Sequence, residues 1–324
     1  YEQRVHEMLR EIAVRAHGRI RLKVIDPVPY SDDEDAAESY GLTPATGGSN
    51  GERVFFGLVG TAGTGDVPPQ AIPFFDPARE PFVEYDIAKL LYELGMPQKP
   101  RLGVISSLPV EGNLVIGEPA WAVVRQLDQL AEVTNIDPDG LKHIDPALKV
   151  LLLIHPKRLS DDAQYAIDQY VLHGGHLVVF VDPDSEMDNA PLVDAHGVVD
   201  DHDSDLRRLF EAWGVVYDPA KVVLDRSQAL TIELNGNSIG HPAMLGLGTQ
   251  DLNHDDVVTA SLQRVNFSTA GFFELATDTK ARLIPLVQTS DEAAVMSAQR
   301  VRDAAGDPTS LLENYEPTHE RYVL

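Results

Sequence analysis

Five polar residues of the sequence could do chemistry, because they lie at or just beyond the ends of short apolar runs. They are Ser106, Ser107, His155, Asp182 and Asp184. A serine activated by a histidine that a carboxylate orients is the arrangement of a nucleophilic hydrolase. Neither serine lies in a G-x-S-x-G elbow. We therefore expect these five residues to line a ligand cleft or to make loop hydrogen bonds, and we expect no catalytic residue.

Metal and phosphate sites are the other chemistries that the residue types suggest. The histidines of 173-HGGH-176 flank a helix stop before a strand, which points their rings in different directions. His241 and His254 are scattered, and the Gly-rich stretches 46–51 and 60–65 lack the Lys-Ser pair of a P-loop. We expect turns at both stretches, no metal and no cofactor. The acids 32–35 occupy a helix first turn, where the helix dipole favours them.

The segment 148–183 predicts the elements that position three of the five residues. Apolar runs at 150–154 and 177–181 flank a helix over 160–175, which Ser160 caps and two glycines end. Strand, helix and strand form a βαβ unit, which requires a right-handed crossover and a largely parallel sheet. Ligands bind at the carboxyl ends of such strands, so the candidate residues should converge there.

Further patterns extend this sheet into an α/β domain over residues 98–324. A buried strand at 101–109 precedes a helix over 119–132, and an acidic loop over 184–203 precedes a helix over 204–214. We expect Trp121 and Trp213 in these helices to be core residues. A further strand is predicted at 221–225. Residues 226 to about 290, with strand candidates at 229–234 and 282–289, form an elaboration at the sheet edge, and the polar tail 291–318 is partly ordered.

Residues 1–97 have the element order of a thioredoxin-like domain that lacks its first strand. The patterns predict in turn a helix, a half-buried strand, a helix, a two-stranded hairpin and a closing helix: 2–16, 19–26, 31–41, 53–60 with 70–75, and 82–95. The chain has no cysteine, so it has no CxxC motif. Disulfide, thiolate and Cys-ligated metal chemistry are excluded with it.

Composition limits the partners more than it limits the fold. The chain has 324 residues, which suits two domains, and 43% of them are hydrophobic, which is enough for two cores. Its formal charge of −25 repels phosphate backbones, so we expect no nucleic acid partner. No run approaches the roughly 20 apolar residues of a membrane span. The chain opens inside a helical pattern and stops on the strand-like 321-RYVL-324, so we expect it to be a fragment.

Long stretches of the sequence, in order, resemble one family. They include 19-RIRLKVIDPVPYSDDEDAAESYGL-42, 72-IPFFDPAREPFVEYDIAKLLYEL-94, 151-LLLIHPKRLSDDAQYAIDQYVLHGGHLVVFVDP-183, 209-LFEAWGVVYDPAKVVLD-225 and 251-DLNHDDVVTASLQRVNFSTAG-271. These stretches resemble the GldG-type auxiliary proteins of uncharacterised ABC transport systems, some of which are linked to gliding motility. The second domain also resembles glutamine-amidotransferase-like and flavodoxin-like sheets, without the cysteine nucleophile of true amidotransferases.

The resemblance implies a protein anchored in the bacterial inner membrane by helices outside this segment. It places this segment in the periplasm, with the ABC permease and ATPase of the same system as partners. We interpret the chain as a non-catalytic module that binds a partner or a ligand. Two alternatives stay open, namely a hydrolase that uses the strand-end cleft and a carbohydrate-binding domain with an aromatic-lined groove.

Overall fold

The computed structural model describes most of the chain and divides it into two compact units. The described residues are 1–47, 52–63, 67–95, 99–113, 117–188, 192–194, 197–199, 201–234 and 236–324. Unit 1 comprises Tyr1–Lys99 and unit 2 comprises Pro100–Leu324. Within the described part, no helix has the length and apolar composition that crossing a membrane requires.

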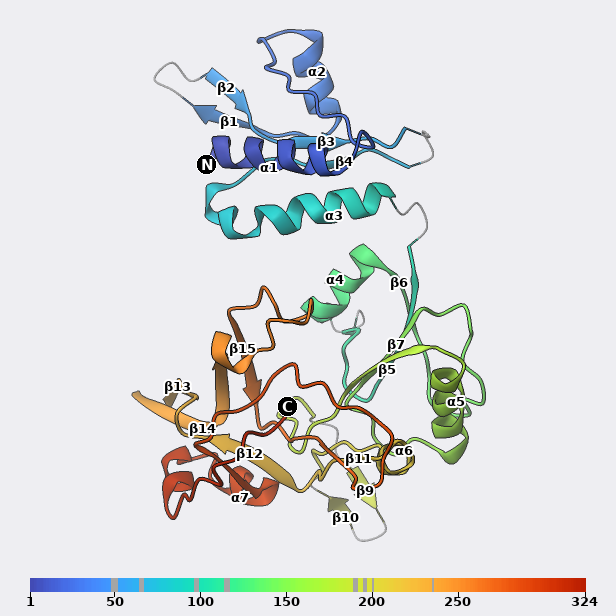
Figure 1. The fold of residues 1–324 in the computed structure, drawn as a ribbon, viewed down its shortest axis with the longest axis vertical. Helices are drawn as coiled ribbons and strands as arrows, with labels where there is room; N and C mark the ends of the chain where they lie inside the picture. Colours follow the sequence, from blue (N-terminus) through green and yellow to red (C-terminus); the bar gives the residue numbers. More distant parts are fainter. Residues whose placement is uncertain are drawn as a thin grey trace. The chain divides into compact units, whose positions relative to one another are not determined.

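Unit 1 packs helices against two small antiparallel sheets (Figure 1). Its elements are α1 (Glu2–Arg15), α2 (Asp32–Ser39), β1 (Pro44–Gly47), β2 (Glu52–Phe55), β3 (Leu58–Gly60), β4 (Gln70–Ile72), the 3₁₀ helix η1 (Pro77–Phe82) and α3 (Val83–Gly95). Val5 of α1 and Ile87 of α3 meet in a shared apolar cluster with Phe75. The Ser31 side chain accepts a hydrogen bond from the Glu34 N–H and so begins α2 as the sequence predicts.

Two predictions for unit 1 need correction. Residues 19–26 form no strand, because nothing in the described residues pairs with them; Val24 is 68% exposed. Alternation predicts which side of a strand is buried, but a strand also requires a hydrogen-bonded neighbour. The predicted hairpin exists only as β3 with β4, since β2 pairs instead with β1.

Unit 2 is built around a four-stranded parallel sheet in the order β6-β5-β7-β8. Its elements are β5 (Arg101–Ser106), α4 (Ala122–Leu130), β6 (Glu132–Asn135), β7 (Val150–Ile154), α5 (Asp161–Leu172) and β8 (His176–Phe180). Leu151 and Leu153 of β7 pack with Ile167 of α5 on one face. Leu152 packs on the other face in a cluster that contains Val124 of α4. This double burial explains the continuous apolar run of β7 and confirms the prediction of a mostly parallel sheet.

The remainder of unit 2 is antiparallel. It contains β9 (Leu192–Asp194), β10 (Gly197–Val199), α6 (Arg207–Trp213), β11 (Val215–Val216), β12 (Lys221–Asp225), β13 (Ala229–Leu234), β14 (Asn237–Gly248), η2 (Thr249–Asp251), β15 (Arg264–Ser268), β16 (Glu274–Leu275), β17 (Ala293–Ser297), α7 (Ala298–Asp303) and η3 (Pro308–Leu312). The sheets are β13-β14-β15, β12-β17, β11-β16 and β9-β10. Among the described residues, none of these strands joins the parallel sheet, so the predicted edge elaboration is a separate set of sheets.

Three segments of this region differ from what the local sequence patterns predict. The predicted loop 184–203 contains the hairpin of β9 and β10. The predicted strand 282–289 makes only isolated bridges, at Val287 and Gln288. The polar tail 291–318 contains β17 and α7, and it buries Ala293 fully against β12. Many of the buried apolar groups of this tail are alanines, such as Ala293, Ala294, Ala298 and Ala304, which are too small to stand out as a periodic pattern.

The core of the parallel sheet should dominate the stability of unit 2. Leu153 has no exposed surface, whereas Leu172 at the end of α5 is 69% exposed. We expect Leu153→Ala to lower the free energy of unfolding by about 2–5 kcal/mol and Leu172→Ala to leave it nearly unchanged. Both tryptophans of the chain lie in unit 2, so tryptophan fluorescence during urea unfolding reports on this unit. Equal losses in the two variants would contradict this assignment of the core.

Candidate functional site

The carboxyl ends of β5 and β7 lie at the point where the strand order of the sheet reverses. The connection after β5 leads to β6 on one side, and the connection after β7 leads to β8 on the other. In open α/β sheets this switch point is where a ligand crevice forms. Ser106, Ser107 and His155 all sit at these two strand ends, so the sequence-derived placement matches the topology.

The two serines make local hydrogen bonds at this edge. The Ser106 hydroxyl donates to the Leu108 carbonyl at 2.9 Å and accepts from the Leu108 N–H at 3.0 Å. The Ser107 hydroxyl accepts from the Lys157 N–H at 3.2 Å, and the Ser107 N–H donates to the Ile154 carbonyl. The loops after β5 and β7 are therefore tied together across the switch point.

His155 is the most buried of the five candidates, with 2% of its surface exposed. Its backbone has φ +48°, a left-handed conformation that is rare for a residue with a large side chain. The His155 N–H donates to the Phe180 carbonyl, and Nε2 lies 3.2 Å from Oδ2 of Asp188. Nδ1 is buried and has no hydrogen-bond partner among the described residues.

A buried ion-pair network surrounds this histidine, and we call it the strand-end cluster: His155, Lys157, Asp188 and Asp201. The Lys157 ammonium lies 2.6 Å from the Asp188 carboxylate and 3.6 Å from the Asp201 carboxylate. The Lys157 and Asp188 side chains are only 14% and 2% exposed. Burial lowers the pKa of His155, while the hydrogen bond and the charge of Asp188 raise it by a smaller amount. The imidazole is therefore neutral, and Lys157 supplies the positive charge.

Asp182 and Asp184 belong to a different network. The Asp182 carboxylate accepts from the Asp184 N–H at 2.8 Å, and the Asp182 N–H donates to the Ser204 hydroxyl. Asp184 pairs with Arg302 of α7 at 3.0 Å, and its carbonyl accepts from the Thr269 hydroxyl. These two residues thus connect the end of β8 to the antiparallel part of unit 2. The structure does not join all five candidates into one constellation, and a ligand at this edge stays a prediction.

Three members of the strand-end cluster were missed by the sequence analysis. Lys157 carries a usable signal, because it lies two residues beyond His155 in the same strand-end loop. Asp188 and Asp201 lie in a segment whose acidity indicates only a solvated loop. Their roles depend on long-range packing, which local pattern does not contain.

Among the described residues, His155 makes no hydrogen bond to either strand-end serine. A general base must lie within hydrogen-bond reach of the proton that it removes. Nε2 faces Asp188, Nδ1 is buried, and both serine hydroxyls bond to backbone groups of the two loops. A carboxylate, an imidazole and a lysine in this geometry form a structural network.

The other sequence-derived candidates also have structural partners. His173 bonds through Nδ1 to the Gln169 carbonyl, and His254 bonds to the Thr249 and Ala260 carbonyls. Trp121 and Trp213 pack partly buried against the two clusters that cover the parallel sheet. Across the described ranges, no three His, Asp or Glu side chains are grouped to hold a metal. Residues 48–51 and 64–65 of the Gly-rich stretches lie outside the described residues.

Fold and site together define a two-unit α/β protein whose parallel sheet ends in a structural ion-pair network. Residues 99–324 match the family described as ABC-type uncharacterized transport system, whose members are auxiliary components. The chain therefore belongs to this family of ABC transport auxiliary proteins. Residues 1–61 match a domain of unknown function (DUF7088). No curated protein and no solved structure matches the chain.

The buried ion pair should matter far more for stability than an exposed one. Lys157→Met removes the ammonium from a carboxylate that is 2% exposed, and we expect it to cost about 3–5 kcal/mol of unfolding free energy. Lys142→Met is the matched control, because Lys142 pairs with Asp162 at 3.7 Å in solvent and should cost at most about 1 kcal/mol. Urea unfolding of both variants measures the difference. A cost for Lys157→Met no larger than for the control would show that the cluster does not stabilise unit 2.

Asp182 should make stability depend on pH. Burial raises its pKa from 3.8 to about 6, with further contributions from the charges of Asp184 and Glu186 and an opposing one from the Asp184 N–H. A raised pKa means that the folded state holds the proton more tightly. This contribution to stability is therefore complete below the unfolded pKa near 3.8 and is lost as the pH rises through about 6.

The variant Asp182→Asn isolates this effect, because the amide oxygen can still accept from the Asp184 N–H. We expect the variant to gain about 2–3 kcal/mol over the wild type at pH 7–8 and to match it near pH 4. His155 makes stability depend on pH in the opposite direction. It does so equally in the wild type and in the variant, so its effect cancels in the difference between their free energies of unfolding. Urea unfolding as a function of pH gives this difference. The exposed Asp139→Asn serves as control, and a difference that stays flat with pH for Asp182→Asn would refute the assignment.

Proposed function

We propose that this chain is the non-catalytic, periplasmic part of a GldG-type ABC-transport auxiliary protein, and that it binds a partner or ligand of the transport system. The partners are the permease and the ATPase of the same system, on the periplasmic side of the bacterial inner membrane. Helices outside this segment anchor the protein there. Unit 1 corresponds to the thioredoxin-like domain and unit 2 to the amidotransferase-like domain of this proposal.

The observation that carries the non-catalytic part is the geometry of His155. Its ring lies in a buried network with Asp188 and Lys157, and its second nitrogen is buried. A nucleophilic serine would need that imidazole at hydrogen-bond distance, and both strand-end serines bond elsewhere. Membership in an auxiliary transport family supports the same conclusion.

Charge and redox chemistry support a binding role beside a membrane. The formal charge of −25 keeps the chain away from anionic headgroups and from nucleic acid, so contacts with a transporter must be made by shape and specific pairing. The absence of cysteine removes the redox function of a thioredoxin-like fold, which leaves a scaffold for recognition. Energy for transport then comes from the separate ATPase.

Co-purification tests the proposal in the native system. We expect the tagged full-length protein to retain the permease and the ATPase through detergent extraction, and we expect added protease to cleave this segment from the periplasmic side of spheroplasts. Cleavage only after the inner membrane is opened would contradict the periplasmic location. Loss of both subunits, while they still associate with each other, would contradict the partnership.

A hydrolase assay is the second arm of this test. Ester, amide and glycoside substrates should show no turnover by the wild type above that of Ser107→Ala and His155→Gln. Turnover that disappears in these variants, with the fold intact by circular dichroism, would make the chain an enzyme and overturn the non-catalytic proposal.

A further inference from the structure

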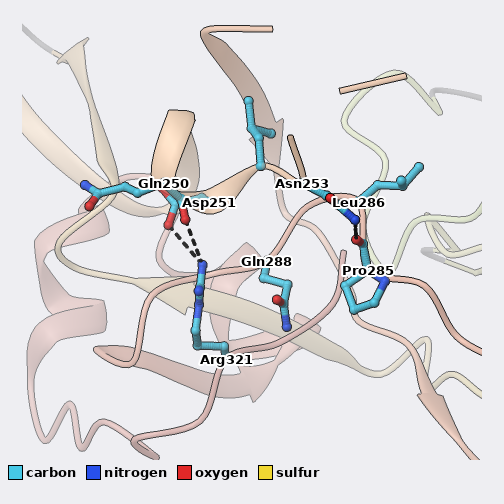
Figure 2. Close-up of a pocket in the computed structure, with 8 residues that line it drawn as sticks. Gln250, Asp251, Asn253, Pro285, Leu286, Gln288 and Arg321 are labelled. Atoms are coloured by element: carbon cyan, nitrogen blue, oxygen red, sulfur yellow. Dashed lines mark hydrogen bonds and ion pairs between the residues drawn. The ribbon is translucent and has the colours of Figure 1, made fainter. Parts of the chain in front are cut away.

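A separate pocket lies in the antiparallel part of unit 2, remote in sequence from the strand-end cluster. It has a volume of about 240 Å³ and is lined by residues of three segments (Figure 2), namely 250–253, then Pro285, Leu286 and Gln288, and Arg321. Backbone bonds hold the segments together, from the Asn253 N–H to the Leu286 carbonyl and from the Gln288 N–H to the Asp251 carbonyl. The walls are therefore fixed by main-chain pairing.

The guanidinium of Arg321 is held in one orientation at the wall of the pocket. Nε donates to the Thr289 carbonyl at 2.6 Å, and Nη2 lies 3.4 Å from both the Gln250 carbonyl and Oδ1 of Asp251. The Asp251 side chain is only 4% exposed, and its other oxygen accepts from the Gly248 N–H. Figure 2 shows the two side chains facing each other. The arginine is thus oriented before any ligand arrives, which reduces the ordering cost of binding.

Several polar groups of the pocket have unused hydrogen-bonding capacity. Within the described part of the chain, Nη1 of Arg321 and the side-chain amides of Gln250 and Gln288 make no hydrogen bond to protein groups. A glutamine amide offers both a donor and an acceptor. Pro285 and Leu286 add an aliphatic part to the lining.

Charge and size select the class of ligand. The carboxylate of Asp251 offsets the guanidinium of Arg321, so the pocket has no net charge, and the strongly acidic chain repels anions. The two amides supply donors and acceptors together, which suits neutral hydroxyl groups. The volume lies below the ~300–1,000 Å³ of clefts that take drug-sized ligands, so the ligand is small.

We propose that this pocket binds a small neutral polyhydroxylated ligand, of the size of a monosaccharide or a cyclic polyol. Gln288 and Nη1 of Arg321 bond its hydroxyls, and the Pro285–Leu286 segment packs against its carbon skeleton. The proposal goes beyond the transport role and does not depend on it. Binding is measured with the chain alone, so its failure and a failure of the transporter partnership are separate results.

Titration calorimetry and protein-observed NMR with D-glucose, N-acetyl-D-glucosamine and myo-inositol test the proposal, with D-glucuronate as the anionic comparison. We expect at least one neutral probe to bind saturably and more tightly than glucuronate. Gln288→Ala should weaken this binding about three- to tenfold, the effect of one or two lost hydrogen bonds. Gln250→Ala gives a second measure at another lining residue. Neither side chain makes a hydrogen bond to another described residue, so both variants should fold.

Gln263→Ala is the matched control, because Gln263 is exposed and does not line the pocket. It should leave the affinity unchanged. Three results would overturn the proposal: no saturable binding of any neutral probe, tighter binding of glucuronate than of the neutral probes, or equal weakening by Gln263→Ala and Gln288→Ala.

Discussion

Unit 2 depends on one constraint, which is that the parallel strands β5 and β7 must be buried on both faces. Leu151 and Leu153 pack toward α5, and Leu152 packs toward the cluster that contains α4. With both faces covered by helices, the strand ends are the places where polar side chains can gather. The serine, histidine and lysine at the ends of β5 and β7 are therefore a consequence of the topology before they are a sign of any function.

The strand-end cluster illustrates why a suggestive set of residues need not be a catalytic one. A left-handed backbone at His155 costs about 1–3 kcal/mol and persists because the Phe180 carbonyl and the Asp188 carboxylate both hold this residue. Low dielectric around Asp188 strengthens its attraction to Lys157 and also makes the loss of that partner costly. The same burial encloses Nδ1 of His155, the atom that a general base would have to offer. Burial is therefore the cause of both the rigidity of the strand-end cluster and the inaccessibility of the His155 ring.

The sequence predicted the elements whose signals are local. Ser160 accepts from the Ala163 N–H at the start of α5, and the apolar run 150–154 is the buried strand β7. Strand pairing is not local, which is why 19–26 was wrongly predicted as a strand and β14 was missed. Pro242 argues against a strand, yet the pairing of β13 with β14 shifts register around it, from Leu230–His241 to Ala229–Leu245. An irregularity at that position lets β14 contain a residue that cannot donate to the ladder.

The strand-end cluster and the pocket at Arg321 differ in how much of each could be predicted from the sequence. The reason is how far apart their residues lie along the chain. The strand-end residues follow apolar runs that any reader of the sequence can locate. The pocket instead joins residues near 250, 285 and 321, and no short pattern connects them. Val323 bridges both Phe273 and Gln288, and the Tyr322 N–H donates to the Thr289 hydroxyl, so residues 321–324 lie as a strand-like wall between distant segments. These long-range contacts bring Arg321 to Asp251, and the polar groups of three separate segments form one neutral surface.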